Sequence, residues 1–421
     1  MDLKKAKKIV EANLTKTMGC TDIGVVGYIA SIGSYVLRDK KIESVTLNMS
    51  EELYKNAVNV GVPGLKKSGL DKALALGILL KNPKKQLSVF ESVTNDDIAK
   101  IEGILNQIEV KINYKRYEDT VLYEELTITS TEGDIVTIII KDSYDNVTSV
   151  EFNGDRLKDF EKDKLIRKAT NTNIKSYDEI LEFVHRGEFK GLENLFDIAQ
   201  IQYENARREI RIQGGKYLVE DLRQEQKECM YDLSNFLRKH ISVPSRKRME
   251  GDIYTVYGVA GSGNLGIGTL ISPKFLAHSL NISNEEEQKL IVLSFFTSVY
   301  VKQKMSIVTV LCGTGHATGC STAAVTTFIR KGTNEQIKQA VNLYLSTSMG
   351  YVCDGAKLSC TNKVAFAAMN GMIAGKMVID NDDACDGTGL NKIDIEISLD
   401  NLGKLNNEIL SNVNKGIIEL I

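Results

Sequence analysis

Four of the seven cysteines in this chain lie between residues 312 and 360. Cys353 and Cys360 bracket the segment CDGAKLSC, and Cys312 lies upstream beside a glycine-rich turn. Thiolates from two separated loops can bind one face of a cubane iron–sulfur cluster and leave the fourth iron open for a substrate. Spacing alone is equally compatible with zinc, or with buried cysteines that pack as small hydrophobic side chains.

The other cysteines and the histidines narrow the kind of site. Seven is an odd number and the chain is long, so a disulfide framework is not expected. With only four histidines, a histidine-rich metal site is excluded. We interpret Cys229, Cys320 and Cys385 as structural.

A glycine-rich loop, GSGNLG at 261–266, fits the GxGxxG pattern after a strand-like segment. A dinucleotide fold also needs alternating strands and helices and an acidic residue after a second strand, and neither surrounds this loop. A pyridoxal-phosphate site lacks an obvious Schiff-base lysine. We expect the backbone N–H groups, Ser262 and Asn264 to bind a small carboxylate.

Cys20 stands in GCTD directly before a helical pattern. A helix N-terminus lowers the pKa of a thiol, so we expect Cys20 to act as a thiolate base. The alternative is a thiol in the N-terminal core. A competing base is His316 in GTGHATG, four residues after Cys312, unless the backbone satisfies its ring.

Two further positions have polar side chains suited to a substrate carboxylate. Lys55 offers a point charge and Asn56 two donors, although YKN can equally close a turn. Beside the cysteines, Asp354 is expected to orient a ligand loop through backbone bonds, and Lys357 to be a solvated charge.

In order along the chain, these motifs resemble the L-cysteine desulfidase family, relatives of the α-chain of iron–sulfur L-serine dehydratases. The matching motifs are GCT plus an acid at 19–22, YKNAxxVGVPG at 54–64, RMxG at 248–251, GSGNxG at 261–266 and CDGAKxSCxxK at 353–363. The resemblance extends from about residue 17 to residue 375. CDGAKxSC is its most specific element.

This resemblance implies an oxygen-sensitive enzyme with a 4Fe-4S cluster and no pyridoxal phosphate, converting L-cysteine to pyruvate, ammonia and hydrogen sulfide. The implied cluster ligands are Cys312, Cys353 and Cys360. The implied place of Cys20 is near the cluster or in catalysis. The expected partner is therefore a small amino-acid substrate.

Some positions depart from the family pattern. Ile23 replaces a proline, Leu265 replaces a glutamine in the glycine-rich loop, and residues 245–247 read SRK where the family has SDA. These departures concern substrate identity more than the cluster. An L-serine dehydratase on the same scaffold and a non-catalytic iron–sulfur redox sensor therefore stay open as alternatives.

The surrounding patterns predict an α+β fold. Helical patterns occupy residues 1–40, 69–82 and 94–108, with Thr94 as an N-cap, and four strands between 108 and 153 are expected to form an antiparallel meander. Amphipathic helices follow from about 178, then a basic loop at 242–252 and small-residue stretches. We predict an α/β domain with an antiparallel sheet at 1–160 and a mainly helical domain with the cluster loops at 161–421.

Composition is that of a globular protein. Of 421 residues, 43% are hydrophobic and 26% charged, enough for a sizeable core. The net charge of -2 gives no reason to expect nucleic acid or a membrane surface. The N-terminus lacks the apolar run of a signal peptide and no apolar stretch is long enough to span a membrane, so we expect a cytoplasmic protein. Base rates favour a homodimer.

Overall fold

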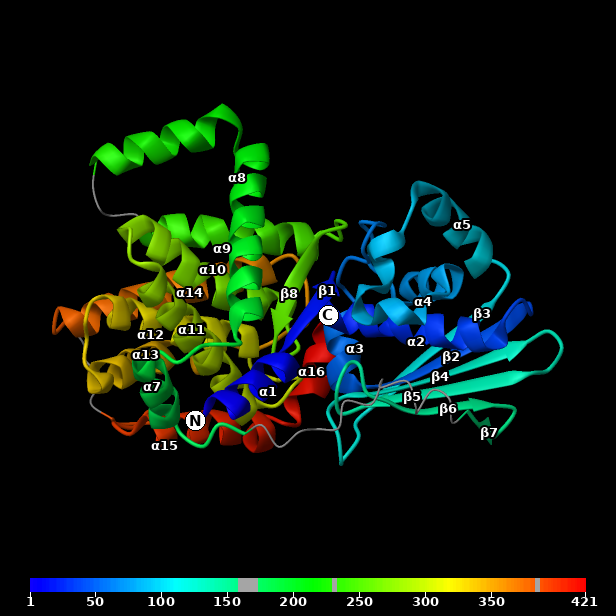
Figure 1. Ribbon diagram of the computed structural model, residues 1–421. Coiled ribbons are helices and arrows are strands. Elements are labelled where there is room, and N and C mark those ends of the chain that lie inside the picture. The colour runs from blue at the N-terminus through cyan, green and yellow to red at the C-terminus, as the bar shows by residue number, and fades with distance from the viewer. Residues whose placement is uncertain (158–172, 229–232, 383–386) are drawn as a thin grey trace.

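The computed structural model describes residues 1–157, 173–228, 233–382 and 387–421, with the backbone alone for 213–228. A twisted sheet with helices on one face forms one side of the molecule, and a helical bundle forms the other (Figure 1). The predicted α+β fold class is confirmed. The predicted domain boundary at residue 160 lies outside the described residues.

The sheet side is built from the N-terminal part of the chain. Its elements are α2 (Thr21–Leu37), β2 (Ile42–Ser50), α3 (Glu51–Ala57), α4 (Leu70–Leu80), the 3₁₀ segment η1 (Pro83–Ser92), α5 (Asn95–Leu105), β3 (Glu109–Lys115), β4 (Tyr123–Ser130), β5 (Ile135–Lys141), β6 (Val147–Phe152) and β7 (Asp155–Arg156). Thr94 caps α5 as predicted, in a capping box with Asp97.

The predicted meander is correct for β4, β5 and β6, which pair antiparallel in sequence order. It is wrong for β3, which pairs parallel with β2 at the other edge, in the strand order β3-β2-β4-β5-β6-β7. The reason lies in the connection to β4. Residues 116–122 lack the two-residue glycine turn that makes a tight hairpin, and the chain crosses over β2 instead.

Helix α2 lies directly on the sheet because one of its residues has no side chain. A Cβ atom at Gly33 would be 2.5 Å from Cδ1 of Ile128 on β4. Ile128 is fully buried, as is Ile138 on β5. The glycine therefore lets the helix backbone approach the sheet closely enough to seal this core.

The helical side follows. Its elements are α7 (Tyr177–Arg186), α8 (Glu193–Glu228), α9 (Leu233–Met249), β8 (Thr255–Val259), α10 (Gly263–Leu280), α11 (Asn284–Met305), α12 (Gly313–Ile329), α13 (Asn334–Ser348), α14 (Cys360–Ile379), α15 (Ile395–Lys404), the π-helical turn η3 (Leu405–Ile409) and α16 (Val413–Leu420). None of the helices in the described ranges is long and apolar enough to cross a membrane.

Small residues bring α12 and α14 together in the middle of the bundle. A Cβ atom at Gly371 would be 2.3 Å from the carbonyl oxygen of Gly319, and one at Gly375 would be 2.7 Å from that of Ala323. Both helices begin at a predicted ligand loop. Their close packing therefore fixes the two loops relative to each other.

The first and last described segments of the chain each connect the two sides of the molecule. The first helix, α1 (Leu3–Asn13), buries Ala6 and Ile9 in the helical core, and β1 (Leu14–Met18) pairs antiparallel with β8. At the other end, α16 packs against α3. The sheet side and the helical side are thus joined at two separate places.

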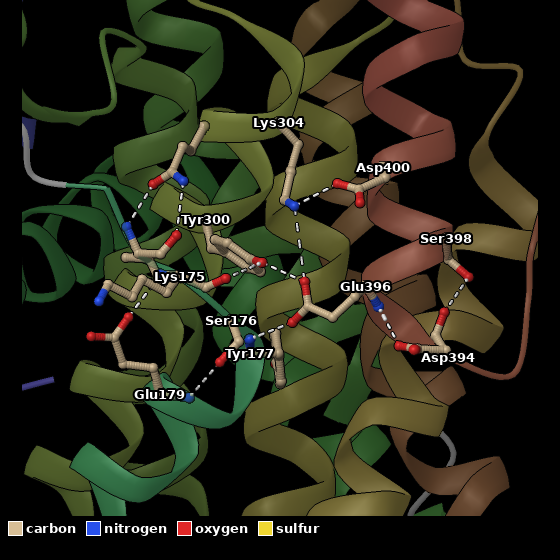
Figure 2. Close-up of polar contacts among 12 residues, drawn as sticks. Lys175, Ser176, Tyr177, Glu179, Tyr300, Lys304, Asp394, Glu396, Ser398 and Asp400 are labelled. Atoms are coloured by element: carbon tan, nitrogen blue, oxygen red, sulfur yellow. Dashed lines mark hydrogen bonds and ion pairs between the residues drawn. The ribbon is translucent and has the colours of Figure 1, made fainter.

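A carboxylate joins three helices at the edge of the bundle (Figure 2). Glu396 on α15 accepts a hydrogen bond of 2.6 Å from the backbone N–H of Tyr177 at the start of α7, and another from the hydroxyl of Tyr300 on α11. Lys304 lies 3.9 Å from the same carboxylate and 2.5 Å from Asp400. Both donors are partly buried, and the Tyr300 hydroxyl also lies 3.5 Å from the carbonyl oxygen of Lys175.

Replacing Glu396 with alanine is expected to lower the free energy of unfolding by about 1–3 kcal/mol. The reason is that the Tyr177 N–H loses its acceptor and the Tyr300 hydroxyl keeps only the 3.5 Å contact with the Lys175 carbonyl. Glu396→Gln keeps one acceptor oxygen and should be less damaging. Urea unfolding of the two variants beside the wild type measures the difference. Equal stability of Glu396→Ala and the wild type would contradict the assignment.

Candidate active site

A cavity of about 100 Å³ lies where the sheet side meets the helical side. Seven of the eight site residues predicted from the sequence are on its wall, together with polar side chains from both sides of the molecule. The wall includes Cys20, Thr21, Asp22, Asn56, Tyr144, Arg248, Ser262, Asn264, Lys302, Cys312, Thr314, Cys353, Cys360 and Lys363.

Local backbone pairing holds two of the three predicted ligands, Cys312 and Cys353, next to each other on the cavity wall. The predicted residue that is absent from the wall is Lys55. Leu311 and Val352 form an antiparallel bridge. On either side of it, the Cys312 N–H donates to the carbonyl of Tyr351 at 2.6 Å, and the Cys353 N–H donates to that of Val310 at 2.7 Å. The two cysteines are therefore held on adjacent strands of chain.

Cys360 reaches the same wall as the first residue of α14. The loop before it turns at Gly355, whose φ is +89°. A Cβ atom there would be 2.3 Å from the carbonyl oxygen of Lys55 on α3. Only glycine allows the ligand loop to pack against the sheet side at this point.

These three side chains are free thiols. Burial raises the pKa of Cys312 to about 12, and the neighbouring Cys353 and Cys360 add to the rise. Burial also raises the pKa of Cys360. Thiols in this arrangement are stabilised as thiolates by a bound metal cation, and binding releases their protons.

Across the described ranges, no three His, Cys, Asp or Glu side chains are gathered tightly enough to hold a single metal ion. A cubane cluster has a different requirement, because its thiolate ligands bind separate irons. Three thiols spread along one cavity wall fit that requirement. The donor set consists of soft sulfur, which iron–sulfur clusters prefer.

Cys20 is the N-cap of α2, as its sequence context predicts. The predicted lowering of its pKa is wrong: burial raises the pKa of this thiol well above its usual value, and the charge of Asp22 raises it further. The Cys20 Sγ–H donates to Asp22 Oδ2 at 3.1 Å. Asp22 Oδ1 accepts from the Tyr144 hydroxyl at 2.9 Å and from the Asn56 amide at 3.4 Å.

The polar side chains of the glycine-rich loop, Ser262 and Asn264, already form hydrogen bonds within the protein. Ser262 is the N-cap of α10, accepting from the Leu265 N–H at 3.2 Å, and its hydroxyl lies 2.9 Å from that of Thr314. Asn264 Oδ1 accepts from Arg248 Nη1 at 3.0 Å and from the Ser245 hydroxyl at 3.1 Å. Asn264 therefore orients Arg248.

Arg248 is a wall residue that we did not propose from the sequence, although it lies in the RMxG motif. The predicted loop at 242–252 is wrong, because α9 continues to Met249 and brings Ser245 and Arg248 onto one helix face. Arg248 is 2% exposed, and its Nε has no hydrogen-bond partner among the described residues. This buried cation lies near the charges of Cys20, Asp22 and Cys360.

Lys302 on α11 is the second buried cation that we missed, and an ordinary amphipathic pattern gives no signal for it. Its ammonium group donates to the carbonyl of Ile307 at 3.1 Å. A Cβ atom at Gly313 would lie 2.9 Å from this nitrogen. Burial lowers the pKa of Lys302 to about 8, against the opposing effect of Cys353 and Cys312.

Four helices begin at the cavity. The first turns of α2, α10, α12 and α14 all contribute wall residues. Helix N-termini present unpaired N–H groups and the positive end of the helix dipole. Together with Arg248 and Lys302, they make a cavity suited to negatively charged groups such as carboxylates and thiolates.

Two predicted residues lie outside this cavity wall. The Lys55 side chain is fully buried, and its ammonium group donates to Asn414 Oδ1 at 2.8 Å and to the carbonyl of Thr309 at 3.3 Å. His316 lies behind Cys312, with Nδ1 2.8 Å from that residue's carbonyl, and burial lowers the pKa of its ring to about 4. The predicted substrate-binding role of Lys55 is therefore wrong, because its ammonium group is hydrogen-bonded inside the protein and does not line the cavity.

Asp354 bridges the ligand loop and α14. It pairs with Lys357, and its Oδ1 accepts from Lys363 Nζ at 2.6 Å. Burial alone would raise the pKa of Asp354, but the hydrogen bonds from the two lysines lower it to about 2. Asp354 therefore orients the ligand loop, as expected, and Lys357 is one of its partners.

Comparison with known proteins identifies the family. The family model described as "serine dehydratase alpha chain" matches residues 84–419. The chain belongs to the serine dehydratase alpha chain family. A UPF0597 protein of Fervidobacterium nodosum is 27% identical over 394 residues, 93% of this chain and 90% of the relative. Another from Caldanaerobacter subterraneus is 27% identical over 430 residues, 100% of this chain and 98% of the relative.

The departures from the sequence motifs fall outside the cavity. Leu265 is fully buried in the helical core, and Ile23 is fully buried in the core beneath the sheet. Arg246 pairs with Glu250, and Lys247 pairs with Glu209. In a member of the serine dehydratase alpha chain family, these changes therefore alter packing and surface and leave the cavity wall intact.

Asp22→Asn is expected to lower the free energy of unfolding by about 1–3 kcal/mol, because an amide cannot accept equally well from Cys20, Tyr144 and Asn56 and no longer offsets the charge of Arg248. The fully exposed Asp39 provides the matched control, since Asp39→Asn should change stability by less than about 0.5 kcal/mol. Chemical denaturation of both variants measures the effect. Equal midpoints for the two would rule out a central role for Asp22.

Proposed function

We propose that the protein is an iron–sulfur-dependent lyase that removes the β-substituent of a small L-amino acid. L-Cysteine is the proposed substrate, giving pyruvate, ammonia and hydrogen sulfide. The observation that supports this most strongly is the cavity itself, in which three thiols, a thiol–carboxylate pair and two buried cations face one another. Membership of the serine dehydratase alpha chain family supports the same reaction type.

The proposed cofactor is a 4Fe-4S cluster held by Cys312, Cys353 and Cys360. Three thiolates leave one iron open, and such an iron acts as a Lewis acid toward a carboxylate and a leaving group. The matched donor set and the cationic surroundings support this assignment. Lys363 lies close to the charges of Cys312 and Cys360 and helps to balance them.

In this proposal, the cationic wall binds the substrate carboxylate. The Arg248 guanidinium has an unpartnered Nε and is held in place by Asn264, so it does not need to reorganise when an anion arrives. Lys302 provides a second positive charge. The N–H groups at the starts of α10 and α12 add donors beside Ser262 and Thr314.

Cys20 and Asp22 form the proposed acid–base pair. Burial and Asp22 oppose ionisation of Cys20, and the charge of Arg248 favours it. The Cys20 proton passes to Asp22 along their 3.1 Å hydrogen bond, and the resulting thiolate removes the α-proton of the substrate. The electron pair of the broken Cα–H bond forms a Cα–Cβ double bond while the Cβ–S bond breaks. Hydrosulfide leaves with the electron pair of that bond and takes the proton held by Asp22, which restores the pair, and water hydrolyses the eliminated product to pyruvate and ammonia.

L-Serine is the second candidate substrate, favoured by the description of the family. The same residues would act, with hydroxide in place of sulfide as the leaving group. A thiolate is the softer ligand and suits iron better, which is why we place L-cysteine first. A non-catalytic iron–sulfur sensor is the third possibility, and it predicts a cluster without turnover.

Anaerobic purification and cluster reconstitution test the proposal. We expect a broad visible absorbance band, about four irons per chain, and equal amounts of sulfide and pyruvate when L-cysteine is added. Pyruvate from L-serine and none from L-cysteine would make the protein a serine dehydratase. A cluster with no turnover of either would favour the sensor, and an iron-free protein after reconstitution would overturn the cluster assignment.

Cysteine substitutions provide the matched comparison. Cys353→Ala should lose the visible band and most of the iron. Cys320→Ala should keep both, because Cys320 is a fully buried thiol in α12 that does not line the cavity. Iron loss in both variants, or in neither, would contradict the proposed ligand set.

A further inference from the structure

We infer that Tyr144 and Ile307 form a constriction that selects substrates by size, between an outer chamber open to solvent and the inner cavity. This inference rests on the proposed function, because it assigns the inner cavity to the substrate. It goes further by naming the route of entry, the residues that limit it, and the class of leaving group that they admit.

The outer chamber is a second cavity, of about 990 Å³, beside the first. The two cavities have five wall residues in common, contributed by elements from both sides of the molecule. These residues are Thr21, Tyr144, Gly261, Lys302 and Ile307. They therefore form the partition between the two cavities.

Contacts within the partition make it narrow. Gly261 has a φ of +79°, and a Cβ atom there would lie 3.1 Å from Cε2 of Tyr144 and 3.4 Å from Cγ1 of Ile307. The Tyr144 ring, from the turn between β5 and β6, and the Ile307 side chain, just after α11, thus meet at a glycine. Tyr144 is 6% exposed, and its hydroxyl is anchored on Asp22 at 2.9 Å.

The polar character of the outer chamber suits an amino acid in transit. Its wall combines apolar residues with uncharged hydroxyl and amide side chains and a few charges of both signs. The uncharged polar residues include Asn13, Thr15, Thr17, Ser143, Asn146 and Gln303. A zwitterion carries no net charge, so such a wall neither traps nor repels it. Lys302 stands at the partition, where it meets the carboxylate first.

The ligand side of the inner cavity offers no equivalent route in the loaded enzyme. Cys353 and Cys360 are partly exposed, so this side is accessible when no cofactor is bound. A cluster held by Cys312, Cys353 and Cys360 would fill it. Entry would then be restricted to the opposite wall, at Tyr144 and Ile307.

The close contacts at Gly261 are the basis of the inferred specificity. In this inference, a substrate with a small –SH or –OH group passes the Tyr144 ring, whereas one with an S-alkyl or O-acyl group would have to displace it. Adding one methylene-sized group against a rigid wall typically lowers kcat/KM by about tenfold or more.

The first test uses thiol labelling and needs no catalytic activity. Full-length, metal-free, reduced protein is treated with iodoacetamide or with fluorescein maleimide, and labelling at each cysteine is followed by mass spectrometry. The readout is the ratio of the two rates at Cys20, which is 5% exposed, with Cys353 and Cys360 as internal references. Using a ratio removes any change in the intrinsic reactivity of the thiol.

Tyr144→Ala and Ile307→Ala should each shift this ratio about tenfold toward the bulky reagent at Cys20 and leave it unchanged at the reference cysteines. Tyr144→Phe keeps the ring and should behave as the wild type, which separates ring bulk from the bond to Asp22. Tyr114→Ala, at an exposed ring stacked on Tyr54, is the matched control. The labelling is repeated on the cluster-loaded protein, in which the ligand side of the inner cavity is occupied. Unchanged ratios at Cys20 in both alanine variants of the loaded protein would overturn the constriction.

The second test compares kcat/KM for L-cysteine and S-methyl-L-cysteine in the cluster-loaded enzyme. Ile307→Ala should raise the relative rate for the larger substrate about tenfold, and Ile307→Trp should lower it. If the wild type turns over neither substrate, the proposed function fails, and the labelling ratio still decides the constriction. Labelling that changes as expected with no change in relative kcat/KM would overturn the size selection.

Discussion

A buried arginine without a dedicated carboxylate partner is the constraint on which the site depends. Arg248 is almost completely removed from solvent, and a charge in that position is unfavourable unless its surroundings compensate. Compensation comes from several sources at once: the Asn264 oxygen, the charge of Asp22 and the nearby cysteines. The cavity is therefore organised around a positive charge that is only partly neutralised, which is the condition for binding an anion.

Much of the site could be predicted from the sequence because its chemistry is local. Cys353 and Cys360 belong to one short loop, and Ser262 and Asn264 to one helix start, so their neighbourhoods follow from consecutive residues. Thr94 as a cap and the β4–β5–β6 hairpins follow from the same kind of local rule.

The missed features depend on tertiary contacts. Lys302 looks like a surface lysine on a long helix and becomes part of the wall only because α11 ends at the cavity. The pKa of Cys20 is decided by burial and by Asp22, which outweigh the helix N-terminus on which the prediction relied. The parallel edge strand β3 depends on a crossing over β2 that no local pattern encodes.

The joining of both chain ends has a consequence for biosynthesis. Lys55, beside the ligand loop, is held by Asn414, which lies 359 residues later in the chain. Strand β1 must likewise wait for β8, which is made much later. Contacts so far apart in sequence form slowly and late. The cavity is therefore completed only after residue 414 has emerged from the ribosome, and any prosthetic group that needs the finished cavity is acquired after that point.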